Sequence, residues 1–134
     1  GTFSVKTTID LRFTVLFPPP LSARDALASG THVLELRVTG PSRNLYQSLS
    51  VPFSADNGVV GSSTTLAGYR WPVNVKPMSA VTHNKVSYGG VSLTLPVAGT
   101  AIQDNGLYGK WLAVAYLDGS PTPCGPAATF AITQ

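Results

Sequence analysis

Two histidines are the side chains of this chain best suited to acid–base or nucleophilic chemistry. His32 lies at the predicted start of a strand, and His83 precedes Asn84 in a predicted strand or turn. Either imidazole, placed within hydrogen-bond reach of a serine and an aspartate, would form the arrangement of a small hydrolase. The chain has, however, no Gly-X-Ser-X-Gly elbow, no His-Glu-X-X-His pair and no phosphate-cradling glycine loop. We therefore interpret both histidines as ordinary surface or partly buried residues and the protein as non-enzymatic.

Residues that bind metals are sparse. Six acidic residues are spread along the chain, and Asp56 and Asp104 each begin an Asp-Asn-Gly turn. Such a turn offers fewer carboxylates than a calcium loop requires. Cys124 is the single cysteine, so no internal disulfide can form. The cysteine and the histidines also lack the spacing of a zinc site. We expect no metal, no cofactor, and a packed Cys124 beside a proline-rich turn.

Aromatic side chains are the best sequence signal for binding. Trp111 heads an alternating strand pattern and is predicted to fill the core. Tyr69 and Tyr108 stand beside glycines at predicted loop positions, and Asn57 and Asn105 lie in the two Asp-Asn-Gly turns. We predict these four residues as ligand or partner contacts, with a glycan as one kind of ligand, because sugars bind where aromatic faces and polar groups converge.

The basic residues are dispersed. Nine lysines and arginines against six acids give a net charge of +3, without a cluster. Because a nucleic-acid surface groups its cations, we expect no nucleic-acid partner for this segment. The chain also has no run of about 18 apolar residues, so no membrane insertion is predicted.

The strongest pattern lies at the amino terminus. Apart from Thr7, the odd positions from Phe3 to Phe17 are apolar, with polar residues between most of them, which predicts one strand over 3–17 with a single buried face. Such a strand would be about 50 Å long at ~3.3 Å per residue, so it must bend or run from one body into another. Pro18, Pro19 and Pro20 follow, and because they donate no ladder hydrogen bonds they predict a hinge.

The remainder, 21–134, is predicted to be a single β domain, with at most a short helical turn over 22–28. Strand patterns alternate with turn signals such as Gly89-Gly90. The predicted strands are 31–39, 45–53, 59–66, 69–75, 81–88, 91–97, 110–117 and 129–133. Because no helix is long enough for a crossover connection, the sheets should be antiparallel. We expect an all-β, two-sheet sandwich or jelly-roll-like barrel of about eight or nine strands.

The long strand, the proline break and the Ala-, Ser-, Thr-, Pro- and Val-rich β domain together resemble a boundary in viral coat proteins. It is similar to the last shell strand and hinge before the C-terminal protruding domain of small icosahedral positive-strand RNA viruses of the tombusvirus, nodavirus and Lake Sinai type. The resemblance implies that 1–17 end a shell domain and that 21–134 project from the virion surface. It further implies dimeric or trimeric self-association, capsomer assembly and attachment to a host-surface glycan or receptor.

An immunoglobulin-like or carbohydrate-binding module of a bacterial secreted or cell-wall protein is the alternative. It would show the same strands, low cysteine count and hydroxyl-rich surface, with the prolines in an internal loop. The first strand separates the two hypotheses. Pairing within this domain favours the module, and a strand that swaps or protrudes favours the capsid.

Overall fold

The computed structural model describes residues 1–17, 31–54, 60–66, 69–74, 76–77 and 79–134, without the side chains of 31, 60–66, 69–74, 76–77, 79–80 and 86–87. The predicted hinge, Pro18 to Pro20, the predicted helical turn over 22–28 and the predicted contact residue Asn57 lie outside the described residues.

Strands make up most of the described chain, and the all-β class is confirmed. The elements are β1 (Thr2–Ser4), β2 (Asp10–Phe17), β3 (Thr31–Thr39), β4 (Leu45–Ser54), β5 (Val60–Leu66), β6 (Tyr69–Asn74), β7 (Lys76–Pro77), β8 (Ser79–His83), β9 (Val86–Pro96), α1 (Ala101–Asp104), β10 (Gly109–Leu117) and β11 (Ala128–Thr133). The only described helix, α1, was not predicted. It is a single turn capped by Thr100, whose hydroxyl accepts a hydrogen bond from the Ile102 amide at 3.3 Å.

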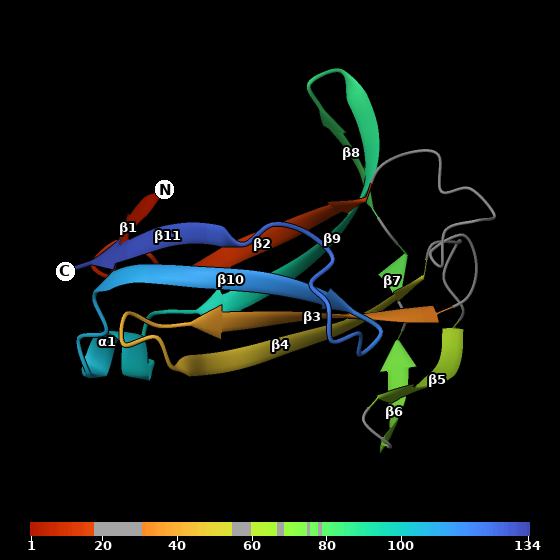
Figure 1. Cartoon of the computed structure of the whole chain (residues 1–134), viewed down its shortest axis with the longest axis horizontal. Helices are drawn as coiled ribbons and strands as arrows, with labels where there is room; N and C mark the ends of the chain where they lie inside the picture. Colours follow the sequence, from red (N-terminus) through yellow and green to blue (C-terminus); the bar gives the residue numbers. More distant parts are fainter. Residues whose placement is uncertain (18–30, 55–59, 67–68, 75, 78) are drawn as a thin grey trace.

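Two sheets form the sandwich (Figure 1). The large sheet has six strands in the order β1-β11-β10-β3-β4-β7, and the small sheet has three in the order β2-β9-β8. The hairpin β5–β6 is a separate two-stranded sheet. The long ladders are antiparallel, whereas β1–β11 and β4–β7 are short parallel pairs. The predicted antiparallel two-sheet sandwich is therefore confirmed.

The strand order corresponds to that of a variable-type immunoglobulin sandwich. In that fold strands G, F, C, C′ and C″ form one sheet, and B, E and D belong to the other. Placing β11, β10, β3, β4 and β7 in the first set and β2, β9 and β8 in the second reproduces both orders. Three features differ. The strand in the place of C″, β7, runs parallel to β4, whereas the immunoglobulin sheet is antiparallel there. Cys124 is unpaired, and the buried tryptophan, Trp111, lies on β10 instead of β3. Apolar packing, without an inter-sheet disulfide, joins the sheets.

The predicted single strand over 3–17 is wrong, because the chain turns between β1 and β2. The amides of Thr7 and Thr8 donate to the Ser4 carbonyl at 3.2 and 3.0 Å. After this turn β2 pairs with β9 in the small sheet, whereas β1 pairs with β11 in the large one. Ile9, which the alternation placed on the buried face, is 76% exposed. The alternation appears continuous because β1 and β2 pack into one core from opposite sheets.

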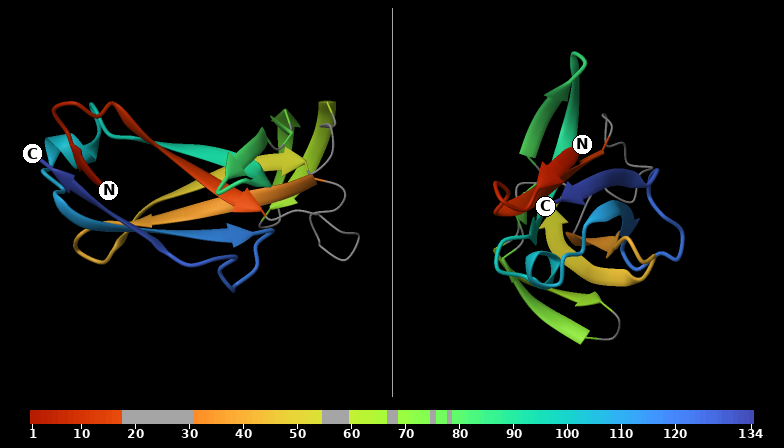
Figure 2. Two further views of the ribbon diagram at one scale, coloured as in Figure 1. Left: turned by 90° about the horizontal axis from the view of Figure 1, so that it is seen from above. Right: turned by 90° about the vertical axis from the view of Figure 1, so that its left-hand side faces the viewer.

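The turn predicted at Gly89-Gly90 is also wrong, because both glycines lie inside β9. They pair with Phe17 and Leu16 of β2. The chain reverses instead at Asn84 and Lys85, whose φ angles are +49° and +64°. Positive φ at both central residues is what a tight hairpin turn requires. The resulting β8–β9 hairpin projects from the body of the molecule (Figure 2).

The core lies between the sheets and contains residues of both. Trp111 is 1% exposed, stacks on Phe130 with ring centroids 6.1 Å apart, and meets the edge of Tyr46 at 5.2 Å. Its Nε1–H donates to the Leu107 carbonyl at 3.1 Å, so the polar atom of the indole is satisfied. The prediction that Trp111 fills the core is confirmed.

Candidate functional site

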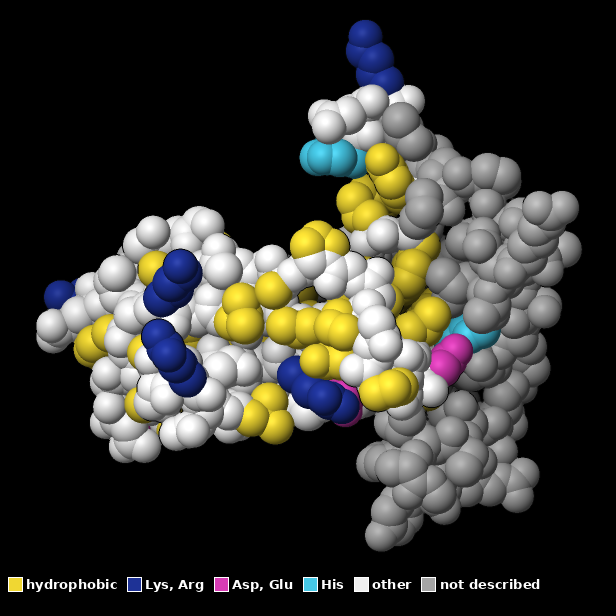
Figure 3. All heavy atoms as spheres, in the orientation of Figure 1, with side chains coloured by type: hydrophobic (Ala, Val, Ile, Leu, Met, Phe, Trp, Pro, Cys, Tyr) yellow, Lys and Arg dark blue, Asp and Glu magenta, His cyan; other side chains and the backbone are white. Residues whose placement is uncertain are grey.

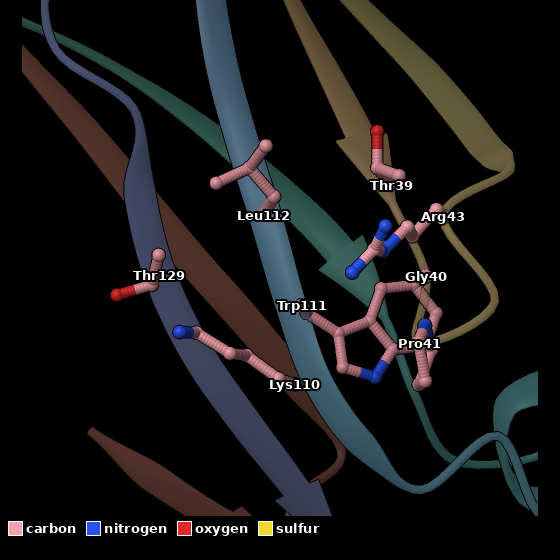
Figure 4. Close-up of a pocket in the computed structure, with 8 residues that line it drawn as sticks. All are labelled: Thr39, Gly40, Pro41, Arg43, Lys110, Trp111, Leu112 and Thr129. Carbon is pink, nitrogen blue, oxygen red and sulfur yellow. The ribbon is translucent and has the colours of Figure 1, made fainter.

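A hollow of about 610 Å³ opens on the large sheet at the β3–β4 turn (Figure 4). Its lining is contributed by β3, the turn, β10 and β11, and consists of Thr39, Gly40, Pro41, Arg43, Lys110, Trp111, Leu112 and Thr129. The Trp111 ring is almost fully buried and forms part of the floor of the hollow. Figure 4 shows the Arg43 and Lys110 side chains on either side of Trp111.

The β3–β4 turn places Arg43 over this hollow. The Gly40 amide donates to the Asn44 carbonyl, and the Arg43 amide donates to the Gly40 carbonyl, both at 3.0 Å. Closing the turn in this way leaves Arg43 at φ +66°. This left-handed conformation costs a side-chain-bearing residue about 1–2 kcal/mol, because its Cβ approaches the following carbonyl oxygen.

The turn rests on the first residue of β10. Gly109 has φ +131°, and a Cβ atom there would lie 3.2 Å from the Pro41 Cβ. The ladder then sets the rest of the site, because Leu112 pairs with Thr39 on one side and with Thr129 on the other. Lys110, two positions before Leu112, therefore projects from the same face of the sheet.

The hollow is positively charged. Two basic side chains and no acidic one line it. The ion pairs among the described residues lie elsewhere, Arg37 with Glu35 and His32 with Asp118, each at 2.7 Å. Arg43 and Lys110 are both exposed and have no described ion-pair partner. A negatively charged ligand would therefore meet two uncompensated cations.

A second hollow of about 360 Å³ adjoins the first and shares Lys110 and Thr129 with it. It continues across β11 to β1, where Thr2, Phe130 and Ala131 contribute to its lining. Because the two hollows share part of their lining, we call them together the basic groove, whose lining residues come from β3, the β3–β4 turn, β10, β11 and β1.

Asn105 and Tyr108, the two predicted contact residues whose side chains are described, are not among the lining residues of this groove. Asn105 is the C-cap of α1, where its backbone amide hydrogen-bonds to the Ala101 carbonyl, and Tyr108 is 36% exposed and close to Gly106. Tyr69 is the first residue of β6 and not in a loop, and its side chain is not described. Their role as contacts stays a prediction.

Sequence reasoning missed Arg43 and Lys110, which it treated as parts of a dispersed surface charge. They are far apart in the chain, and only the pairing of β3 with β10 brings them to one hollow. One local signal was available: Gly40-Pro41-Ser42-Arg43-Asn44 is a turn sequence with an arginine at a position that favours glycine or asparagine.

The two histidines occupy different surroundings. His32 is 7% exposed, its Nδ1 lies 2.7 Å from Asp118 Oδ2, and its ring packs against Phe53 at 5.6 Å. His83 is exposed near the end of the β8–β9 hairpin, with its ring 6.5 Å from that of Tyr88. The burial of His32 leaves its ring little surface for a substrate, which supports a structural interpretation of this pair.

Cys124 was predicted to be packed, but it is exposed. Its amide donates to the Ala115 carbonyl at 2.9 Å, so the loop lies against β10. The residue borders an apolar cavity of about 310 Å³, with Phe13 and Ala113 among its lining. Partial burial of the thiol raises its pKa more than a backbone hydrogen bond lowers it.

Comparison with models of protein families, with curated proteins and with solved structures gives no match to this chain. Among the described residues, His, Cys, Asp and Glu form no group of three that could hold a metal ion. Of the part of the chain that is described, no helix has the length and apolarity to span a membrane.

Proposed function

We propose that this chain is a non-enzymatic, immunoglobulin-like binding module of a bacterial secreted or cell-wall protein. The observation that carries the proposal is the pairing of the amino-terminal strands within the sandwich. β1 pairs with β11, and all eight residues of β2 pair with β9. A strand that pairs within the domain is what distinguishes an autonomous module from the end of a preceding shell domain.

The first 17 residues also contribute to the core. Val5, Leu11 and Phe17 are buried, and Phe17 stacks on Phe53 of the opposite sheet with centroids 5.6 Å apart. Removing a buried side chain of this size costs about 2–5 kcal/mol. Because a domain is stable by only about 5–15 kcal/mol, loss of the whole segment should abolish folding.

The test compares residues 1–134 with residues 21–134 by light scattering and circular dichroism. We expect the full chain to be a folded monomer and the shorter chain to be unfolded. A shorter chain that folds and forms a dimer or trimer would contradict the module and support a viral projection domain instead.

A self-associating projection domain of a viral capsid is the second candidate. Leu112, Val114 and Tyr116 alternate along the outer face of β10, each only half-buried, and Leu45 nearby in the large sheet is 60% exposed. Hydrophobic side chains run along the middle of this face (Figure 3). A second copy packed on them would remove this area from water. The mass of the full chain should then rise with concentration, whereas the module is expected to keep the mass of a monomer.

A further inference from the structure

We infer that the basic groove binds an acidic polysaccharide, whose carboxylate or sulfate groups are held by Arg43 and Lys110. This inference rests on the proposed function as a binding module and adds the chemical class of its ligand.

Charge is the first support. Arg43 and Lys110 line the same hollow, no acidic side chain lines it, and neither cation has a described ion-pair partner. Surface charges of a stable domain are commonly interspersed with opposite ones, and a site lined by one sign concentrates ligands of the other. The groove is therefore complementary to an anion.

The conformation of Arg43 is the second support. A glycine or asparagine would adopt φ +66° with less strain, yet this position holds an arginine that forms no described ion pair. Departures from the best local residue that bring no structural compensation concentrate at functional sites. Lys85 also has a positive φ, in the turn between β8 and β9, but Arg43 differs from it by lining a hollow together with a second cation. The guanidinium, with its fork of donors, matches a carboxylate or a sulfate.

The shape and lining of the groove distinguish among anionic ligands. It spans four strands, and besides its two cations the hydroxyl-bearing residues Thr2, Thr39 and Thr129 contribute to its lining. The Trp111 ring is buried, so the groove has no described aromatic face on which a neutral sugar or a nucleic-acid base would stack. A peptide that adds to a sheet needs a free edge, whereas β3, β10 and β11 are each paired on both sides. The edge strand β1, at one end of the groove, is only 3 residues long. A chain of acidic sugars, with charges and hydroxyls, fits these features best.

The probes are a sulfated hexasaccharide derived from heparin, a hexamer of galacturonic acid and the neutral cellohexaose, each titrated into the full chain by calorimetry. We expect at least one acidic probe to bind, and the two acidic probes separate sulfate from carboxylate recognition. Cellohexaose should not bind. Raising the salt from about 0.05 M to 0.5 M should weaken binding, because screening reduces attraction between exposed charges.

Two matched pairs of variants locate the site. Arg43→Gly and Lys85→Gly each remove one cation from a residue with positive φ, so both should keep or raise the unfolding temperature. Lys110→Gln is matched by Arg12→Gln on the exposed side of β2, in the small sheet. We expect Arg43→Gly and Lys110→Gln each to weaken binding about fivefold or more, and Lys85→Gly and Arg12→Gln to change it less than about twofold.

If Arg43→Gly weakens binding no more than Lys85→Gly does, and Lys110→Gln no more than Arg12→Gln does, the ligand does not bind at the basic groove. Failure of both acidic probes to bind a folded monomer would overturn the ligand class and leave the module proposal intact. Tighter binding of a poly-glutamate peptide or a single-stranded oligonucleotide than of either acidic hexasaccharide would likewise overturn the polysaccharide assignment.

Discussion

Asp118 joins the loop after β10 to the start of β3 with both carboxylate oxygens. Oδ1 accepts a hydrogen bond from the Val33 amide at 2.8 Å, and Oδ2 lies 2.7 Å from Nδ1 of the buried His32. The Asp118 amide donates to the Val33 carbonyl at 2.9 Å, so the residue extends the ladder beyond its last regular pair. Its φ of +51° is tolerated by aspartate and asparagine better than by most residues. This single side chain therefore holds the β3–β10 end of the sandwich.

Replacing Asp118 by alanine should lower the free energy of unfolding by about 2–4 kcal/mol, measured by urea denaturation at pH 7. The variant leaves the Val33 amide and the buried imidazole without their carboxylate partner and places alanine at a positive φ. Asp118→Asn should lose about half as much, because an amide retains one acceptor and tolerates the conformation. Equal losses in the two variants would show that the negative charge, and not the hydrogen-bond geometry, is what stabilises this end.

Within the elements, the β3–β4 turn and the start of β10 depend on each other. Pro41 packs on Gly109, and Gly40 faces the Trp111 ring, where a Cβ would make an ordinary contact at 3.5 Å. The turn that carries Arg43 is thus supported by the strand that carries Lys110.

Gly109→Ala should destabilise the protein by about 1–3 kcal/mol in thermal unfolding, since the added Cβ meets Pro41 and the backbone stays at φ +131°. Gly125→Ala is the matched control, because an added Cβ there has no atom within 4 Å and φ is not positive. Its effect should stay within about 0.5 kcal/mol. A harmless Gly109→Ala substitution would mean that the turn does not rest on β10 as described.

For the whole molecule, Phe130 connects the two sheets through aromatic contacts at the end of the sandwich opposite to the Phe17–Phe53 stack. Its ring lies 5.4 Å from Phe13 of the small sheet, 6.1 Å from Trp111 and 6.5 Å from Phe3. Because these partners come from β2, β10 and β1, cohesion of the sandwich should depend on it.

Phe130→Ala should lower the free energy of unfolding by about 3–5 kcal/mol, the usual cost of deleting a buried aromatic ring. Tryptophan fluorescence and circular dichroism should still report coincident transitions if the sandwich unfolds as one unit. Phe3→Ala, at a residue 37% exposed, should cost about 1 kcal/mol. If the unfolding transitions followed by fluorescence and by circular dichroism do not coincide in the wild-type chain, the two sheets do not unfold as one cooperative unit.

Local features of the chain were predictable from the sequence. The alternation that predicted Trp111 inside β10 follows from the pleat, which points successive side chains to opposite faces whatever the strand pairs with. The same reasoning predicted both bounds of β3 and the all-β class, because turn residues and short apolar runs act within a few positions.

Only the tertiary structure decided which sheet each strand joined and which distant residues met. The alternation of apolar and polar residues continues across the turn at Thr7 and Thr8, so the sequence does not reveal that turn. Likewise, the sequence does not distinguish the two adjacent glycines inside β9 from the glycines of a hairpin turn. The meeting of His32 with Asp118, and of Arg43 with Lys110, depends on the ladder between β3 and β10. That ladder is a long-range pairing selected by burial of the whole core, and no local pattern of residues specifies it.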